Sequence, residues 1–418
     1  MKKLTKVLAA CALMGTLVAC GNKEETVSNS TSTDANAPVT LNVWAMGEEA
    51  KSLGTVAGEF EKQNPNIHVV VQSIPWGMVH QKLLTAIAGD STPDVSMMGT
   101  SFMAEMVQLG AFEELDPYLA KDSATKLTDF IPSTLLTNQF DGKTYGFPWT
   151  ADTRLMFYRK DLMNQAGFKE FPKTWNDLYK LAEAEKKNGV KAPFALPKND
   201  LNASPEMLSA LWQNNTDIID AQGKSLVLTP EFKQSVNYYT SYFKAGLAPL
   251  DLGGELSPLF VGGKVGMFIG GPWMVTLVKT AGGADFANKW GVAVMPTEKS
   301  NTSFLGGSNL VMFKNSKNKA AAYKFMEYMV EPTTALQFYK LTSNLPTVQS
   351  AWSSIESDPI VGVFKQQLNN VKIPSNIPQG PRLYKAFNDE MEAIIYGKVS
   401  VDAGLADLNQ QVDKIMQK

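Results

Sequence analysis

The sequence contains only two cysteines and two histidines among its 418 residues. Both cysteines, Cys11 and Cys20, lie near the N-terminus, so the rest of the chain can form neither a disulfide bond nor a thiolate-bound metal site. His68 and His80 are the only imidazole side chains, which argues against a structural zinc site. We therefore expect neither a metal nor another cofactor.

The sequence also lacks a strong excess of either charge, with 39 basic and 41 acidic residues. It has no basic patch of the kind that binds nucleic acid, so we expect no nucleic-acid partner. It contains no G-x-S-x-G nucleophile motif, and Gly262-Gly263-Lys264-Val265 does not match a P-loop. After residue 20 no apolar run is long enough for a transmembrane helix.

The N-terminus has the pattern of an export signal. Lys2, Lys3 and Lys6 form a positive segment that precedes an apolar run over residues 7–18. This run is too short to span a bilayer. Leu17-Val18-Ala19-Cys20 then resembles the lipobox of bacterial lipoproteins, in which the cysteine is lipidated and becomes the mature N-terminus. We predict a lipoprotein signal peptide over 1–19 and a lipid on Cys20. A simple signal peptide with a chance cysteine is the alternative.

The predicted lipid anchor places the protein on the extracellular face of the cell membrane, or on the periplasmic side if the cell has an outer membrane. Residues 21–37 are mostly Ser, Thr, Asn and Glu, which cannot bury enough apolar surface to fold. Residues 20–38 are therefore predicted to be the lipidated cysteine and a flexible tether. The rest of the chain is too long for one hydrophobic core and fits two lobes.

The folded region alternates between strand and helix patterns. Residues 39–44 alternate like a strand, and the helical spacing of Leu53, Val56 and Phe60 ends before Asn64-Pro65. Further strands are expected over 67–73 and from Pro93 onward. This alternation predicts an α/β protein with largely parallel sheets, whose ligands bind near the carboxyl ends of the strands.

Several segments, taken together and in this order, resemble the extracellular solute-binding proteins of bacterial ABC importers, in the carbohydrate-binding family that includes maltose-binding protein. They are FEKQNPNI (60–67), AGDSTPDV (88–95), YGFP (145–148) with FYRKDL (157–162), PKTWNDL (172–178), and FVGGKVGM (260–267) with GPW (271–273). The resemblance implies a two-lobe periplasmic-binding-protein fold, type II-like, that closes on its ligand by hinge motion. It implies lobe 1 over 39–151 plus 305–344, and lobe 2 over 152–304 plus 345–418.

The resemblance also implies a function. We expect a monomer, not an enzyme, that captures a sugar or oligosaccharide and delivers it to ABC permease subunits in the membrane. A sugar site needs aromatic rings for the C–H faces and polar groups for the hydroxyls. The predicted contacts lie at strand ends and crossings: Trp44, Glu48, Trp76, Trp149, Asp152, Trp273, Ser308, Asn309 and Tyr384.

The remaining tryptophans, Trp175, Trp212, Trp290 and Trp352, are assigned to packing, and Trp44 itself also fits the core because it lies in an alternating strand. Arg154 and Arg382 are expected to pair with carboxylates unless the ligand is acidic.

The sequence departs from the maltose-binding branch at Met98-Gly99-Thr100-Ser101, where that branch has an aromatic and a carboxylate. Maltodextrin is therefore not carried over as the ligand. Two alternatives stay open. One is a secreted glycoside hydrolase that uses Glu48 and Asp152 as a carboxylate pair, and the other is a sugar sensor or adhesin on the same fold.

Overall fold

The computed structural model describes residues 38–47, 49–121, 124–198 and 203–417. The predicted signal peptide, Cys20 and the tether up to residue 37 lie outside the described residues, as does Glu48. Among the described residues, no helix combines the length and the apolar character that a membrane crossing requires.

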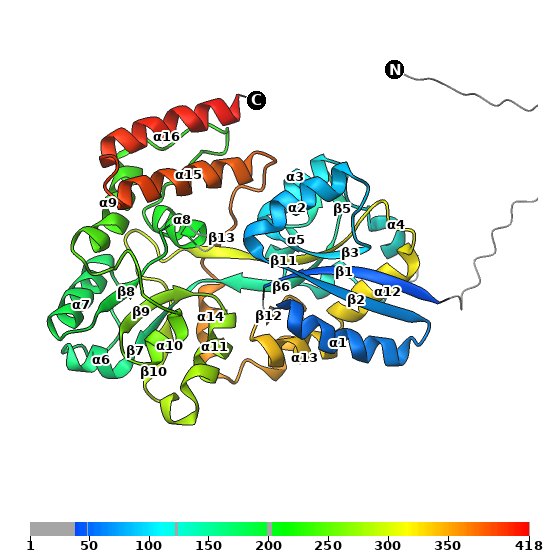
Figure 1. The fold of residues 1–418 in the computed structure, drawn as a ribbon, viewed down its shortest axis with the longest axis horizontal. Coiled ribbons are helices and arrows are strands. Elements are labelled where there is room, and N and C mark those ends of the chain that lie inside the picture. The colour runs from blue at the N-terminus through cyan, green and yellow to red at the C-terminus, as the bar shows by residue number, and fades with distance from the viewer. Residues whose placement is uncertain (1–37, 48, 122–123, 199–202, 418) are drawn as a thin grey trace, which may run out of the picture. The chain divides into compact units, whose positions relative to one another are not determined.

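The larger of two main sheets has seven strands in the order β12-β6-β11-β3-β1-β2, with β13 paired to β11 (Figure 1). These strands are β1 (Val39–Met46), β2 (Ile67–Ile74), β3 (Val95–Gly99), β6 (Phe147–Thr153), β11 (Ser303–Met312), β12 (Leu345–Pro346) and β13 (Val371–Lys372). The helices that pack with this sheet include α1 (Glu49–Gln63), α2 (Trp76–Ala88), α12 (Lys319–Val330) and α13 (Pro332–Thr342).

Helix α1 forms as its spacing predicts. Leu53, Val56 and Phe60 all lie on its buried side, and each is at most 1 % exposed. The Phe60 ring meets Phe325 of α12 edge-on, with centroids 5.2 Å apart. Burial of each such side chain contributes about 1.5–3 kcal/mol, so this face holds the helix on the sheet.

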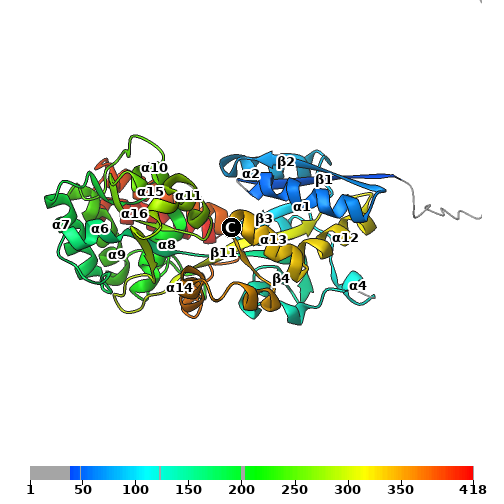
Figure 2. The same ribbon diagram turned by 90° about the horizontal axis from the view of Figure 1, so that it is seen from below.

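The smaller main sheet has four strands in the order β10-β7-β9-β8. They are β7 (Leu155–Arg159), β8 (Ala192–Ala195), β9 (Val265–Gly270) and β10 (Trp290–Ala293). The longer helices in this part of the fold are α7 (Trp175–Lys187), α8 (Ala203–Gln213), α9 (Pro230–Lys244), α11 (Trp273–Gly282), α15 (Gly380–Ile395) and α16 (Val401–Met416). Figure 2 shows the fold from a second side, with β1, β2 and β3 at one end and α6, α7 and α9 at the other.

The remaining elements are short. They are η1 (Thr100–Phe102), α3 (Met103–Gln108), α4 (Asp116–Leu119), η2 (Leu127–Asp129), α5 (Pro132–Leu135), β4 (Gln139–Phe140), β5 (Lys143–Thr144), α6 (Lys160–Gln165), α10 (Leu256–Val261), η3 (Ala284–Phe286), η4 (Gln349–Ser354) and α14 (Pro359–Gln367).

The prediction of largely parallel sheets is wrong. Strand β1 pairs in parallel with β2 and β3, but β11 runs antiparallel to β3 and β6, and β12 runs antiparallel to β6. In the smaller sheet, β7 is antiparallel to both β9 and β10. The reason is the path of the chain, because β11 enters the larger sheet after the elements of the smaller one and runs opposite to β3.

Strands from distant parts of the sequence lie side by side where the chain passes between the sheets. Only Arg154 separates β6 from β7, although the two strands belong to different sheets. In β11, Gly306 pairs with Asp152 and Gly307 with Ala151. Gly307 has φ +125°, and a Cβ there would overlap the Thr150 carbonyl, so this position requires glycine.

Candidate ligand-binding site

Arg154 is the charged centre of the strand crossing. Its residue is 3 % exposed, its Nε donates to Glu206 Oε1 at 3.0 Å, and its Nη1 donates to Asp152 Oδ2. The Ser303 hydroxyl holds the Arg154 backbone, since it donates to the Arg154 carbonyl at 2.8 Å and accepts from the Arg154 amide at 3.2 Å. The prediction that Arg154 pairs with carboxylates is confirmed.

Two aromatic rings enclose the same guanidinium. The Arg154 Cζ lies 4.7 Å from the Trp273 ring centre and 5.2 Å from that of Phe304. Both contacts have the geometry of a cation–π interaction. Trp273 begins α11 and is half-buried, and its ring lies so close to Gly271 that a Cβ there would overlap it. Arg154 and Gly271 therefore fix the position of this ring.

One carboxylate oxygen of Asp152 is hydrogen-bonded and the other is unpaired. Oδ2 faces Arg154, whereas Oδ1 is buried and has no hydrogen-bond partner among the described residues. Burial raises the pKa of the Asp152 carboxyl, and the charge of Arg154 opposes that shift. With Glu206, the cluster holds one cation against two carboxyl groups. An open acceptor in such surroundings suits a neutral hydroxyl donor.

Trp76 lies at the carboxyl ends of β1 and β3. It begins α2 and is half-buried, and its ring borders both Gly47 and Gly99. Ser308 of β11 pairs with Gly99 on one side and with Thr150 of β6 on the other. Ser308 therefore links the end of β3, which the Trp76 ring borders, with the strand that carries Asp152, although Ser308 is only 4 % exposed.

Asn309 and two of the tryptophans point into the core. Asn309 is 1 % exposed and its Oδ1 accepts from Thr137 Oγ1 at 3.1 Å. Trp149 is 2 % exposed, with its ring centroid 4.4 Å from that of Phe338 and its Nε1 without a partner among the described residues. Trp44 is 7 % exposed and belongs to the same core. Their contact with a ligand stays a prediction that burial does not favour.

Tyr384 lies in the first turns of α15. Its Oη donates to the Ser375 carbonyl at 3.1 Å, and burial raises the pKa of this phenol. Helix α15 contacts η1, the short helix that follows Gly99. Trp76 itself belongs to α2, and its ring borders Gly99, the residue before η1.

The four tryptophans assigned to packing are buried, as predicted: Trp175, Trp212, Trp290 and Trp352. Three neighbours of the cluster were not foreseen in the sequence, namely Glu206, Phe304 and Gly271. Gly271 belongs to the GPW motif, which was a usable signal. Glu206 and Phe304 come from segments with no motif of their own.

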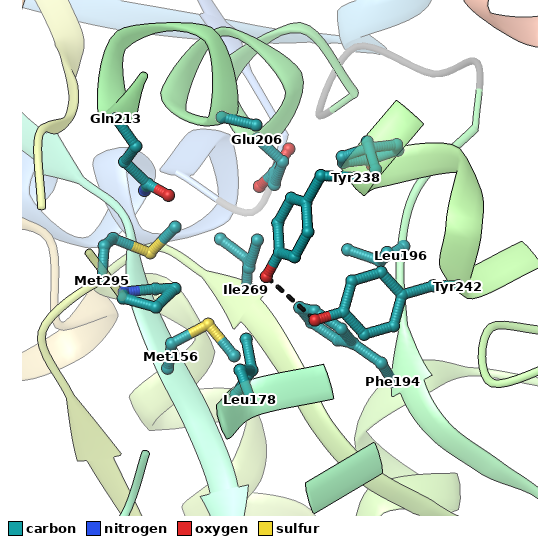
Figure 3. A pocket seen from close by; sticks show the side chains of 13 residues that line it. Met156, Leu178, Phe194, Leu196, Glu206, Gln213, Tyr238, Tyr242, Ile269 and Met295 are labelled. Atoms are coloured by element: carbon teal, nitrogen blue, oxygen red, sulfur yellow. Dashed lines mark hydrogen bonds between the residues drawn. The ribbon is translucent and has the colours of Figure 1, made fainter. Parts of the chain in front are cut away.

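A separate small pocket lies among the elements of the smaller main sheet and its helices (Figure 3). Its walls are mainly apolar, including Met156 and Ile269, and the Tyr238 and Tyr242 hydroxyls are hydrogen-bonded to each other at 2.9 Å. Of the Arg154 cluster, only Glu206 lines it. None of the predicted contact residues within the described ranges does so, and this pocket is therefore not the candidate site.

Comparison with known proteins identifies the class. Residues 46–335 match the model of the bacterial extracellular solute-binding protein family. The chain is 32% identical to the sugar-binding protein MalE of Xanthomonas citri, with a TM-score of 0.78 over 90% of this chain and 97% of that one. It is 26% identical to the GacH receptor of Streptomyces glaucescens, with a TM-score of 0.83 over 91% of this chain and 99% of that one. The galactooligosaccharide-binding protein of Bacillus subtilis is 25% identical over 99% of this chain and 96% of its own.

The chain belongs to the bacterial extracellular solute-binding protein family. Its fold is the two-lobe α/β fold of the MalE-like binding proteins, as the sequence predicted.

Proposed function

We propose that this protein is the lipid-anchored receptor of an ABC importer, and that it binds an oligosaccharide without chemically altering it. The observation that carries the proposal is the cluster at the strand crossing, where the Trp273 ring and the buried, unpaired Asp152 oxygen lie beside Arg154. An aromatic ring next to a hydrogen-bond acceptor is what a sugar ring requires. The relatives support the same ligand class, since one is named for galactooligosaccharides and GacH has been solved with acarbose.

We propose that residues 39–151 plus 305–344 form one lobe and that 152–304 plus 345–418 form the other. The sugar would bind between them, next to the crossing strands β6, β11 and β12. A ligand that contacts both lobes favours the closed form, since only a difference in affinity can shift that equilibrium. The closed monomer would then pass the sugar to membrane permease subunits.

We propose a neutral saccharide as the substrate class. Arg154 is already bonded to Asp152 and Glu206, and its side chain is 4 % exposed. An acidic sugar would have to displace one of these carboxylates from a buried ion pair, which is costly. Arg382, the other arginine considered, is exposed on α15.

A thermal-shift screen tests the function directly. The panel would hold maltotriose, mannobiose, galactobiose and diacetylchitobiose, with galacturonic acid oligomers as the acidic arm. A ligand that binds only the folded state raises Tm, by an amount that grows with its concentration. Neutral members should raise Tm, the acidic arm should not, and chromatography should recover each sugar intact. Sugar cleavage, or no shift with any saccharide, would contradict the proposal.

Trp273→Ala should weaken binding of the best panel sugar by on the order of 1–3 kcal/mol, because the variant loses the ring on which the sugar stacks. Isothermal titration calorimetry measures the change. Leu277→Ala is the matched control, since Leu277 is a 37% exposed side chain on the same helix, α11. Equal affinity of the two variants, both shown to be folded by circular dichroism, would remove Trp273 from the site.

Cys20→Ala should release the protein from the membrane fraction into the medium or periplasm while leaving sugar affinity unchanged. The lipid on Cys20 is the proposed anchor, and no described helix can replace it. Cell fractionation followed by immunoblotting measures the distribution. A variant that stays in the membrane fraction would show that Cys20 is not the anchor.

A further inference from the structure

The ring of Trp76 borders two glycines at the carboxyl ends of neighbouring strands. Strands β1 and β3 pair in parallel, Val43 with Val95 and Trp44 with Ser96. Gly47 is the residue that follows β1, and Gly99 is the last residue of β3.

The two glycines leave just enough room for the indole. A Cβ at Gly47 would lie 2.8 Å from Trp76 Nε1, and a Cβ at Gly99 would lie 3.0 Å from Trp76 Cζ3. A Cβ at Gly47 would force an atom to move and a Cβ at Gly99 would press on the ring, so the indole fills the space beside both glycines. The two glycines thus border the pyrrole and benzene parts of the indole, and the residue is half-buried, so part of its surface is accessible.

The Trp76 ring lies where an aromatic side chain is missing from the end of β3. The strand after the PDV motif ends in Met98-Gly99, without the aromatic side chain that the resemblance would place there, and Met98 is fully buried. Trp76, which comes from the start of α2, lies over that same strand end. The residue pairs Gly99–Ser308 and Ser308–Thr150 then connect it across the sheet to β6, the strand of Asp152.

We infer that Trp76 is a second sugar-stacking ring, placed by Gly47 and Gly99, and that it binds the apolar C–H face of a pyranose. The inference rests on the proposed saccharide function and adds the residue that determines where a sugar unit lies against the first sheet. A glycine at position 99 is then a specificity-determining residue, because any larger side chain would displace the ring.

Gly99→Ala separates this role from backbone effects. Gly99 has φ −59° and ψ 136°, which alanine adopts without strain, so the substitution adds only the Cβ next to Trp76. Gly47 is less suitable, because its φ of +60° would strain any other residue. Gly58→Ala, in helix α1, is the matched control, since no atom lies within 4 Å of the added Cβ.

The experiment is a double-mutant cycle measured by calorimetry with the panel sugar that gives the largest thermal shift. Trp76→Ala should weaken binding about tenfold, and Gly99→Ala about threefold or more. Gly99→Ala should have no further effect in the Trp76→Ala background, because it acts only through the ring. Gly58→Ala should bind like the wild type, and all variants should keep the wild-type circular dichroism spectrum.

Each outcome decides one question. Unchanged affinity in Trp76→Ala, with binding lost in Trp273→Ala, would overturn the inference and leave the sugar-binding function in place. An equal loss from Gly99→Ala with and without Trp76 would show that the glycine does not act through the ring, which also overturns it. If no panel sugar binds the wild-type protein, the proposed function fails first.

Discussion

Replacing Arg154 by methionine is expected to lower the free energy of unfolding by about 3–5 kcal/mol at pH 7, the cost of breaking a buried ion pair on one side. The side chains of Asp152 and Glu206 are 15% and 3% exposed, and both depend on the same guanidinium. Methionine fills a similar volume between Trp273 and Phe304 but supplies no charge. Urea unfolding followed by circular dichroism measures the loss.

Two further measurements distinguish charge from packing. The triple variant Arg154→Met, Asp152→Asn, Glu206→Gln should recover much of the lost stability, because no charge then lies buried without a partner. Lys365→Ala breaks an ion pair with Glu356 whose members are 57% and 47% exposed, and it should cost no more than about 1 kcal/mol. If the triple variant is no more stable than the single one, the defect lies in packing.

The loss of unfolding free energy caused by Arg154→Met should also be smaller at acidic pH. Burial raises the pKa of the Asp152 carboxyl and Arg154 opposes that shift, so loss of the guanidinium raises this pKa further and a lower pH neutralises Asp152 in the folded state. The same cluster joins the strand crossing to the proposed sugar contacts. A change in stability at Arg154 is therefore expected to accompany weaker sugar binding, which a surface ion pair would not produce.

Many of the helices and strands are determined by residues close to one another in the chain, and these elements can be predicted from the sequence. The helical spacing before Asn64-Pro65 predicts α1, and the alternation over residues 39–44 predicts β1. Each element is fixed by its own buried face, so a short window of sequence suffices. The pairing of Arg154 with carboxylates is predictable for a similar reason, since a buried guanidinium needs a counter-charge.

The strand directions and the ring positions depend on distant segments, and the sequence does not reveal them. The Trp76 ring borders both Gly47 and Gly99, although more than one helix and strand separate these glycines in the chain. Glu206 reaches Arg154 from α8, and Phe304 reaches it from β11. No local pattern marks either residue as a partner of Arg154, so only the folded chain identifies them.

Glu185→Gln is expected to remove a pH dependence from the stability of the protein. Glu185 lies on α7 and is 1 % exposed, and its carboxylate is so close to β9 that a Cβ at Gly266 would overlap it. Burial raises the pKa of Glu185 from 4.5 to about 8; Arg159 opposes this shift and Asp161 adds to it. The folded protein therefore keeps this carboxyl protonated at neutral pH, whereas the unfolded chain ionises it.

The sign of the effect follows from the protons bound. Between pH 4.5 and about 8 the folded state holds one more proton than the unfolded state at this site, so stability falls as pH rises. The slope is about 1.4 kcal/mol per pH unit in the middle of that window. Urea unfolding of wild type and Glu185→Gln at pH 5, 6, 7 and 8 gives the difference, which should grow with pH in favour of the variant.

Glu183→Gln is the matched control, because Glu183 is an exposed carboxylate on the same helix. It should follow the wild-type stability at each pH within a few tenths of a kcal/mol, as expected for an exposed surface substitution. A wild-type-minus-Glu185→Gln difference that stays constant from pH 5 to pH 8 would mean that Glu185 ionises normally inside the fold. In that case water or Arg159 must reach the Glu185 carboxylate, and α7 must pack less tightly on Gly266 of β9 than the structure shows.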